Sequence, residues 1–212
     1  IFELNQPFEG DGKSMVKTIN RYSGISWSTD EVAFLYDYWW NTRNEKTYTF
    51  NPSKKDDSPE IIFDRNYQDK YNDPGNLVMI KNEYGRKIVH QKEGVVSLIS
   101  DGFTKEGQFP KLYTMNVLSG KKEMLYKSKM VDKLENIVRY IPKTGQVITR
   151  IESPNEFPNY YIKKLKSKKQ SALTSFENPF KGLEDVHKEV ITYKREDGIE
   201  LSGTLYLPLG YD

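Results

Sequence analysis

Cysteine is absent from this 212-residue sequence, and histidine is scarce, with His90 and His187 alone. The lack of cysteine excludes disulfide bonds and thiolate metal sites. No apolar run reaches the roughly 18 residues that a membrane-spanning helix needs, so we expect no membrane span. The sequence contains neither a Gly-x-Ser-x-Gly motif nor a glycine-rich phosphate loop. We therefore assign no catalytic residue and expect no cofactor.

The sequence also lacks a large excess of positive or negative charge. Lys and Arg number 32 and Asp and Glu 30, which gives a net charge of +2. This near balance argues against a protein dedicated to nucleic acid. The lysine-rich segment 163–169 (KKLKSKK) is interpreted as a solvated turn between two strands. We expect no nucleic acid partner.

The sequence leaves the cellular compartment of the protein unassigned. The absence of cysteine gives no disulfide signature, and residues 1–10 have no signal-peptide pattern. An exported or periplasmic bacterial protein would carry its signal upstream of Ile1.

The residues that are abundant indicate an all-β, turn-rich protein. The chain has 15 Tyr, 14 Gly and 10 Pro, together with many Thr, Val and Ile. The turn Trp27-Ser28-Thr29-Asp30, which is typical of the opening of a β-propeller blade, precedes the apolar run 32–36. A run that is apolar on both faces fits a strand in a sheet covered on both sides, although a buried helix gives a similar pattern. The aromatic residues that follow favour the strand.

A repeated order of aromatic strand, lysine-containing turn and short apolar strand occurs three times. Tyr48, Tyr113 and Tyr161 mark equivalent positions, 65 and then 48 residues apart. This spacing is close to the roughly 40–50 residues of a four-stranded propeller blade. We predict about three blades, fewer than the roughly four to eight of a closed ring. The spacing of Val131, Leu134 and Ile137 also allows a short helix, but a strand over 137–141 fits the repeat better.

Residues 190–212 predict a hairpin. A β-rich stretch, 190–194, is followed by Asp197-Gly198, which is a signal for a two-residue turn, and then by an alternating strand. Leu201, Leu205 and Leu207 share one face of that strand. Nothing after them covers this apolar face, so we expect the hairpin to begin a further unit. The predicted division is a propeller fragment over 1–180 and a linker with a first hairpin over 181–212.

Several segments together resemble the prolyl oligopeptidase family of serine peptidases, and most closely its glutamyl-endopeptidase branch of plastids and bacteria. The resemblance extends from Arg21 to Asp212 and is most specific in two segments, 64–75 and 197–212. The first reads DRNYQDKYNDPG, and the second contains the Asp-Gly turn and ends in LPLGYD. The other segments are RYSGISW (21–27), WWNTR (39–43), EGQFP (106–110) and ESPNEFPNYY (152–161).

The resemblance implies an N-terminal β-propeller that caps a C-terminal α/β-hydrolase domain. The hairpin then corresponds to the first strands of that absent domain, and the Ser-Asp-His triad would lie beyond Asp212. The propeller would restrict the access of peptide substrates to the active site. The parent protein would hydrolyse peptide bonds, after Glu in the branch that the chain resembles.

Few residues are candidates for a site. Asp64, Asp69 and Asp73 form an acidic cluster near Arg65, which we interpret as turn and ion-pair chemistry in preference to a metal site. A peptidase that cleaves after Glu needs a cation for the substrate carboxylate, and arginine suits this role. Arg65 and Arg150 are therefore the candidate binding residues. His187 is interpreted as a linker residue.

An alternative function is a non-enzymatic binding or scaffold propeller, with the hairpin as its own last strands. An open arc of blades leaves sheet edges bare, so we expect edge-to-edge self-association of the fragment. The three tryptophans, Trp27, Trp39 and Trp40, could stack on sugars, but aromatic residues beside apolar strands are expected in the core.

Overall fold

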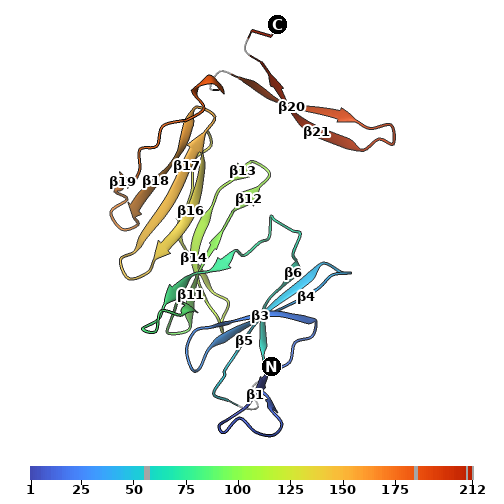
Figure 1. Ribbon diagram of the computed structural model, residues 1–212, viewed down its shortest axis with the longest axis vertical. Helices are drawn as coiled ribbons and strands as arrows, with labels where there is room; N and C mark the ends of the chain where they lie inside the picture. The colour runs from blue at the N-terminus through green and yellow to red at the C-terminus, as the bar shows by residue number, and fades with distance from the viewer. Residues whose placement is uncertain (55–57, 184–185, 209, 212) are drawn as a thin grey trace.

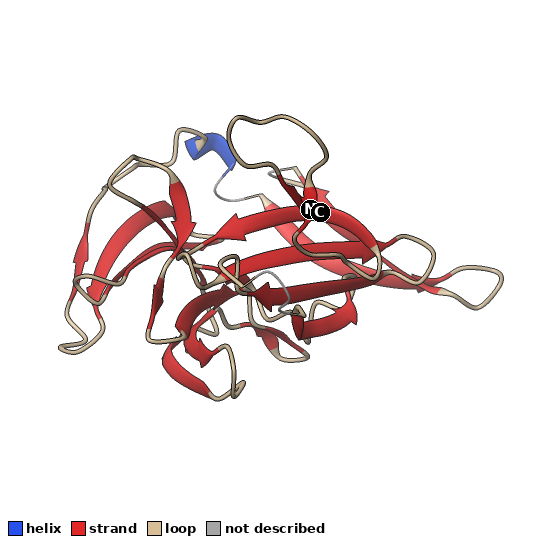
Figure 2. Ribbon diagram, turned by 90° about the horizontal axis from the view of Figure 1, so that it is seen from below, coloured by secondary structure: helices blue, strands red, loops and turns tan. Residues whose placement is uncertain are grey.

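Antiparallel sheets make up almost the whole computed structural model, which describes residues 1–54, 58–183, 186–208 and 210–211. Three main sheets follow one another along the chain, from β3–β6 near the N-terminus to β16–β19 (Figure 1). Within the described ranges, one short helix occurs, η1 (Lys181–Leu183), and the other elements are strands (Figure 2). The fold confirms the predicted all-β class and its partial propeller of about three blades. Among the described residues, no helix has the length and hydrophobicity needed to cross a bilayer.

The first sheet, blade 1, is a meander in which each strand pairs with the next. Its strands are β3 (Arg21–Trp27), β4 (Ala33–Trp39), β5 (Asn44–Phe50) and β6 (Glu60–Asn66). Ala33, Phe34 and Leu35 of β4 are fully buried although they alternate between the two faces of the sheet. This confirms the predicted strand with two covered faces.

Different partners cover the two faces of β4. Phe34 packs into a cluster with residues of the second sheet, among them Val96, Leu98 and Met115. Ala33 and Leu35 pack on the other side, against the N-terminal segment, where Val16 is buried. That segment contains the small ribbon of β1 (Phe2–Glu3) and β2 (Lys13–Ser14). Ile1, Met15 and Val16 thus cover part of this second face of β4.

The second sheet, blade 2, runs in the order β10-β11-β14-β15, and β7 also pairs with β11. The strands are β7 (Asn76–Leu77), β10 (Gln91–Lys92), β11 (Val95–Ser100), β14 (Lys111–Asn116) and β15 (Lys122–Lys127). Two short ribbons lie in its connections: β8 (Met79–Lys81) with β9 (Lys87–Val89), and β12 (Phe103–Thr104) with β13 (Gly107–Gln108).

The third sheet, blade 3, is again a four-stranded meander. It consists of β16 (Leu134–Ile141), β17 (Gln146–Ser153), β18 (Glu156–Lys164) and β19 (Gln170–Ala172). The strand β16 contains Leu134 and Ile137, two of the three residues that could also have formed a helix, and it includes residues 137–141, so the preferred strand is confirmed. Val78 and Leu112 of blade 2 and its connections form a buried cluster with Val147 of blade 3. Apolar contact of this kind is the main force that holds neighbouring blades together.

The predicted repeat matches the sheets. Tyr48, Tyr113 and Tyr161 lie on β5, β14 and β18, each of which is the third strand of its sheet. Tyr48 and Tyr113 are buried, whereas Tyr161 is half-buried. The three tyrosines therefore occupy equivalent strands in the three blades.

The hairpin of β20 (His187–Lys194) and β21 (Glu200–Leu207) stands apart from the blades (Figure 1). Its strands pair with each other in a two-stranded sheet, and every residue of β20 is exposed. The alternation predicted for β21 is present, with Leu201, Leu205 and Leu207 on the less exposed face.

The predicted two-residue turn is wrong. The backbone N–H of Arg195 donates to the carbonyl of Ile199, and the backbone N–H of Gly198 donates to the carbonyl of Arg195. Three residues, 196–198, therefore form the loop, with Gly198 at φ +83°. A type I turn that ends in a left-handed glycine has this geometry.

Candidate functional site

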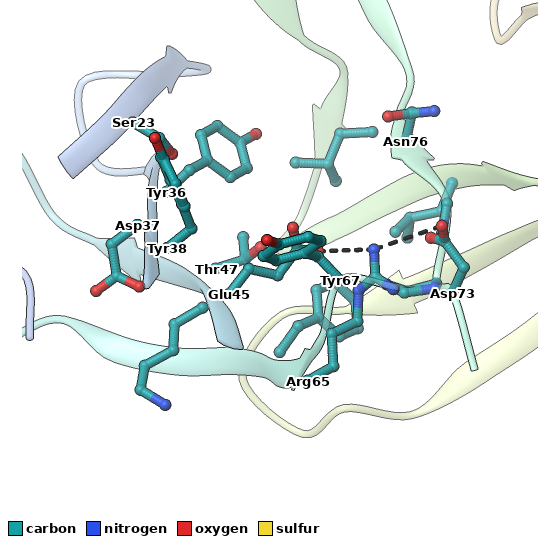
Figure 3. Close-up of a pocket in the computed structure, with 16 residues that line it drawn as sticks. Ser23, Tyr36, Asp37, Tyr38, Glu45, Thr47, Arg65, Tyr67, Asp73 and Asn76 are labelled. Carbon is teal, nitrogen blue, oxygen red and sulfur yellow. Dashed lines mark hydrogen bonds and ion pairs between the residues drawn. The ribbon is translucent and has the colours of Figure 1, made fainter. Parts of the chain in front are cut away.

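The guanidinium of Arg65 lies between two carboxylates (Figure 3). Its Nη2 is 2.7 Å from Oε1 of Glu45 on the neighbouring strand β5 and 3.4 Å from Oδ2 of Asp73 in the segment leading to blade 2. Its Nη1 donates to the carbonyl of Asp69 at 3.1 Å. The Arg65 side chain is 16% exposed. These contacts fasten the last strand of blade 1 to the connection that follows it.

A cleft of about 530 Å³ surrounds this arginine. Its lining includes Tyr36, Tyr38 and Tyr67, and the carboxylates of Asp37, Glu45 and Asp73 lie beside two cations, Arg65 and Lys46. Burial raises the pKa of Tyr36, so this hydroxyl stays protonated at neutral pH. The cleft thus offers hydroxyl donors and carboxylate acceptors to a polar ligand, while its arginine charge is already balanced.

The acidic cluster divides among separate partners. Asp64 accepts hydrogen bonds from Nζ of Lys46 and Nδ2 of Asn44, each at 2.6 Å, and these bonds lower its pKa. Asp69 accepts from the side chain and backbone of Asn72, which lower its pKa as well. Among the described residues, no three His, Cys, Asp or Glu side chains gather as a metal site would require. The geometry agrees with turn and ion-pair chemistry.

Arg150 has fewer partners than Arg65. It lies on β17 opposite Tyr160, and its Nη2 donates to the carboxylate of Glu152 two residues along the same strand. This hydrogen bond raises the pKa of Arg150. The Arg150 side chain is 36% exposed, and its buried Nε has no hydrogen-bond partner among the described residues. Arg150 is therefore more accessible than Arg65 to a ligand.

The structure does not bring the two candidate arginines together. Arg65 belongs to blade 1 and Arg150 to blade 3, and Arg150 is not among the described residues that line the Arg65 cleft. They form two separate candidate positions.

Neither histidine forms part of a recognisable catalytic arrangement. His90 is half-buried, and burial lowers its pKa, while its buried Nδ1 has no partner among the residues described. His187 is exposed at the start of β20, where its Nε2 is 3.5 Å from a carboxylate oxygen of Glu189. In the described part of the chain, no serine hydroxyl is hydrogen-bonded to either imidazole.

A buried polar network was missed at the sequence level. Oε2 of Glu135 accepts a hydrogen bond from the Tyr126 hydroxyl at 2.6 Å, and its Oε1 accepts one from Nζ of Lys163 at 3.0 Å. The Glu135 side chain is fully buried, and that of Lys163 is 14% exposed. The interpretation of 163–169 as a solvated turn is thus wrong for Lys163, which is part of β18. A single acidic residue at the start of an apolar strand is the only sequence signal for this network.

The expectation that the tryptophans are core residues is also wrong. Trp27, Trp39 and Trp40 are 45%, 47% and 64% exposed. Trp27 and Trp39 are the last residues of β3 and β4, and Trp40 lies in the following turn, where the Arg43 guanidinium stacks 3.7 Å from its ring. Side chains at strand ends extend past the neighbouring sheet and so remain uncovered.

Comparison with known proteins gives relatives over nearly the whole chain. The chain is 34% identical, over 99% of its length, to "Probable glutamyl endopeptidase, chloroplastic" of Oryza sativa subsp. japonica, and covers 24% of that protein. It is 32% identical over 98% of its length to the protein of the same name from Arabidopsis thaliana, of which it covers 23%. Among solved structures, oligopeptidase B from Trypanosoma brucei matches with a TM-score of 0.45 and 11% identity, over 90% of this chain and 32% of that one. No family model matches.

The fold defines a class, an open partial β-propeller of about three blades. Within that class, the two plant relatives confirm the resemblance to glutamyl endopeptidases. The chain spans about a quarter of the length of these relatives.

Proposed function

We propose that this chain is the non-catalytic propeller portion of a serine peptidase and controls the access of peptides to a Ser-Asp-His site beyond Asp212. The observation that supports this most is the 34% identity to a glutamyl endopeptidase over 99% of the chain. The blades support it as well, because a propeller that covers an active site admits only short or unfolded peptides. In this proposal residues 1–180 form the propeller fragment, and residues 181–212 are the linker and first hairpin of the hydrolase domain.

The hairpin is consistent with that division. Its two strands pair with each other and not with a blade, and Ile191, Tyr193 and Leu201 share a face that the described residues leave largely uncovered. A hydrolase domain that continues from the hairpin would bury this face.

The proposed substrate is a peptide with Glu before the scissile bond. Its carboxylate needs a cation, and a carboxylate that approached Arg65 would have to displace two protein carboxylates. At Arg150 it would compete with Glu152 alone. Arg150 is thus the stronger of the two candidates for a contribution from the propeller side.

A chromogenic peptide with Glu before the reporter group tests the proposal. We expect the natural full-length protein to release the reporter and to be labelled by a fluorophosphonate, which reacts with activated serines. We expect the isolated 212-residue chain to do neither. Turnover by the isolated chain would contradict the proposed position of the active site.

The coding sequence after Asp212 separates this proposal from the scaffold alternative. A Gly-x-Ser-x-Gly motif followed by Asp and His supports the peptidase. A stop codon directly after Asp212 supports a non-enzymatic propeller.

A further inference from the structure

A cleft lined by lysines lies where blade 2 meets blade 3. It has a volume of about 620 Å³ and is bordered by β15, by the segment after it and by the turn between β18 and β19. Four lysines line it: Lys127, Lys129, Lys163 and Lys168. We refer to it as the lysine cleft.

The positive charge of the lysine cleft is only partly compensated. The one carboxylate among its described lining residues, Glu135, is buried and already pairs with Lys163. No described carboxylate lies within salt-bridge distance of Lys127, Lys129 or Lys168. Three exposed lysines thus face one cleft in a chain whose net charge is only +2.

The excess of positive charge does not extend over the whole surface, because another cleft has the opposite sign. The cleft beside the turn between β3 and β4 has a volume of about 640 Å³ and is lined by Asp30, Glu31, Glu60 and Glu93 with one described cation, Lys54. The lysine cleft, with four lysines and one described carboxylate, therefore has a local positive excess on a surface that is not uniformly basic. A local excess of this kind attracts ligands of the opposite charge.

The lysine cleft also has an apolar floor and a strand edge. Met124, Leu125, Met130 and Leu165 line it between the lysines. Residues 124–127 belong to β15, which is the last strand of blade 2 in the sheet order. Such an edge carries backbone N–H and C=O groups that can pair with an added strand.

We propose that the lysine cleft binds an extended acidic peptide segment, which adds along β15 and directs its carboxylates to Lys127, Lys129 and Lys168. Alternate side chains of an added strand point to one side, so apolar residues between the acidic ones would rest on Leu125. A peptide fits better than a nucleic acid because Tyr126, whose hydroxyl is bound to Glu135, is the only aromatic side chain among the lining residues that the structure describes. This site is separate from the proposed cleavage chemistry and does not depend on it.

Fluorescence anisotropy with a labelled peptide of alternating Glu and Val tests the site on the natural full-length protein, after treatment with a serine-directed inhibitor. The probe should bind, and a matched Gln/Val peptide should bind at least about tenfold more weakly, because exposed ion pairs contribute modestly but additively. The triple variant Lys127→Glu, Lys129→Glu, Lys168→Glu should weaken binding of the acidic probe by at least about tenfold. The neutral triple variant, with Gln at the same positions, should fall between the two.

A matched control carries the same change in net charge elsewhere. Lys13, Lys81 and Lys87 are exposed and distant in sequence from the cleft, and their triple change to Glu should leave the dissociation constant within about twofold. An equal loss in this control variant overturns the proposal, because a general field would then explain the binding. Equal binding of the Gln/Val peptide, or tighter lysine-dependent binding of an oligonucleotide or of anionic vesicles, overturns it too. Absence of binding by the Glu/Val peptide also overturns the proposal.

Discussion

Glu135 is the most deeply buried charged side chain of the network between blades 2 and 3. It comes from β16, whereas Tyr126 comes from β15 and Lys163 from β18, so the network joins two sheets. Burial opposes ionisation of Glu135, but the combined hydrogen bonds from Tyr126, Lys163 and Ser128 outweigh burial and lower its pKa below the ordinary value of 4.5. The same environment raises the pKa of Tyr126, through burial and the neighbouring carboxylate. The carboxylate is therefore charged at neutral pH and compensates the Lys163 ammonium.

The change Glu135→Gln should lower the free energy of unfolding by about 3–5 kcal/mol at neutral pH, because it leaves a buried cation without its partner. Since the pKa of Glu135 is lowered on folding, its ionised form stabilises the protein above the ordinary pKa, and this contribution is lost as pH falls through the lowered value. The gap between wild type and variant, measured by urea denaturation, should therefore shrink below pH 4.5. The double change Glu135→Leu with Lys163→Met should lower the free energy of unfolding by less than Glu135→Gln alone. A gap that stays constant from about pH 7 to about pH 3 would contradict the assignment.

At the scale of the element, local sequence predicted the strands well because their signal is local. The alternation of β21 and the apolar run of β4 depend on a two-residue period and on burial, and both were correct. The prediction of a two-residue turn was wrong because the sequence Asp197-Gly198 is compatible with more than one type of loop. A two-residue type I′ turn needs a positive φ at both residues, and only Gly198 has one.

The candidate site could be predicted only by residue type. Arg65 and Arg150 were selected as arginines suited to a carboxylate, but their partners Glu45, Asp73 and Glu152 depend on register and on the path of a connection. The same limit applies to the Glu135 network, whose members come from three strands. Side-chain partners across strands are not contained in a local pattern.

The conformation of the connection from blade 1 to blade 2 depends on one residue, Gly75. It follows Asp73-Pro74 in the connection to blade 2, has φ +83°, and a Cβ placed there would lie 2.0 Å from the carbonyl oxygen of Ile99. The change Gly75→Ala should therefore lower the free energy of unfolding by at least about 2 kcal/mol more than Gly85→Ala. Gly85 is the matched control, with φ +73° and no atom within 4 Å of the added Cβ. Equal losses for the two variants in thermal denaturation would show that backbone strain alone matters.

At the scale of the whole molecule, the three blades form an open series and the hairpin lies outside them (Figure 1). One face of the hairpin gathers Ile191 and Tyr193 with Leu201 and Leu205, whereas Ser202 and Thr204 lie on the other face. An uncovered apolar face next to free strand edges favours association between copies.

The isolated 212-residue chain should therefore self-associate with rising concentration, as measured by sedimentation velocity. The double change Leu201→Lys and Leu205→Lys should shift it toward the monomer, because it places charge on the apolar face. The double change Ser202→Lys and Thr204→Lys adds the same charge to the polar face and should have a smaller effect. Equal shifts would indicate that charge repulsion, and not the apolar face, controls the association.

Arg150 connects the propeller to the specificity proposed for the whole protein. If its guanidinium receives part of the charge of a substrate Glu, then Arg150→Gln in the full-length protein should raise KM for Glu peptides about fivefold, which corresponds to about 1 kcal/mol for an exposed ion pair. The value of kcat should change little, because such a contact is made equally in the ground state and the transition state.

The neighbouring carboxylate supplies a test of opposite sign. Glu152 competes for Arg150, so Glu152→Gln should lower KM for the same peptides. Arg139→Gln is the matched control, since Arg139 is an exposed arginine on β16 without a described ion pair. A global loss of charge would raise KM equally in the Arg139 and Arg150 variants. Opposite changes for Arg150→Gln and Glu152→Gln, with none for Arg139→Gln, would assign the carboxylate contact to Arg150, whereas an unchanged KM in all three would leave substrate recognition to residues outside this chain.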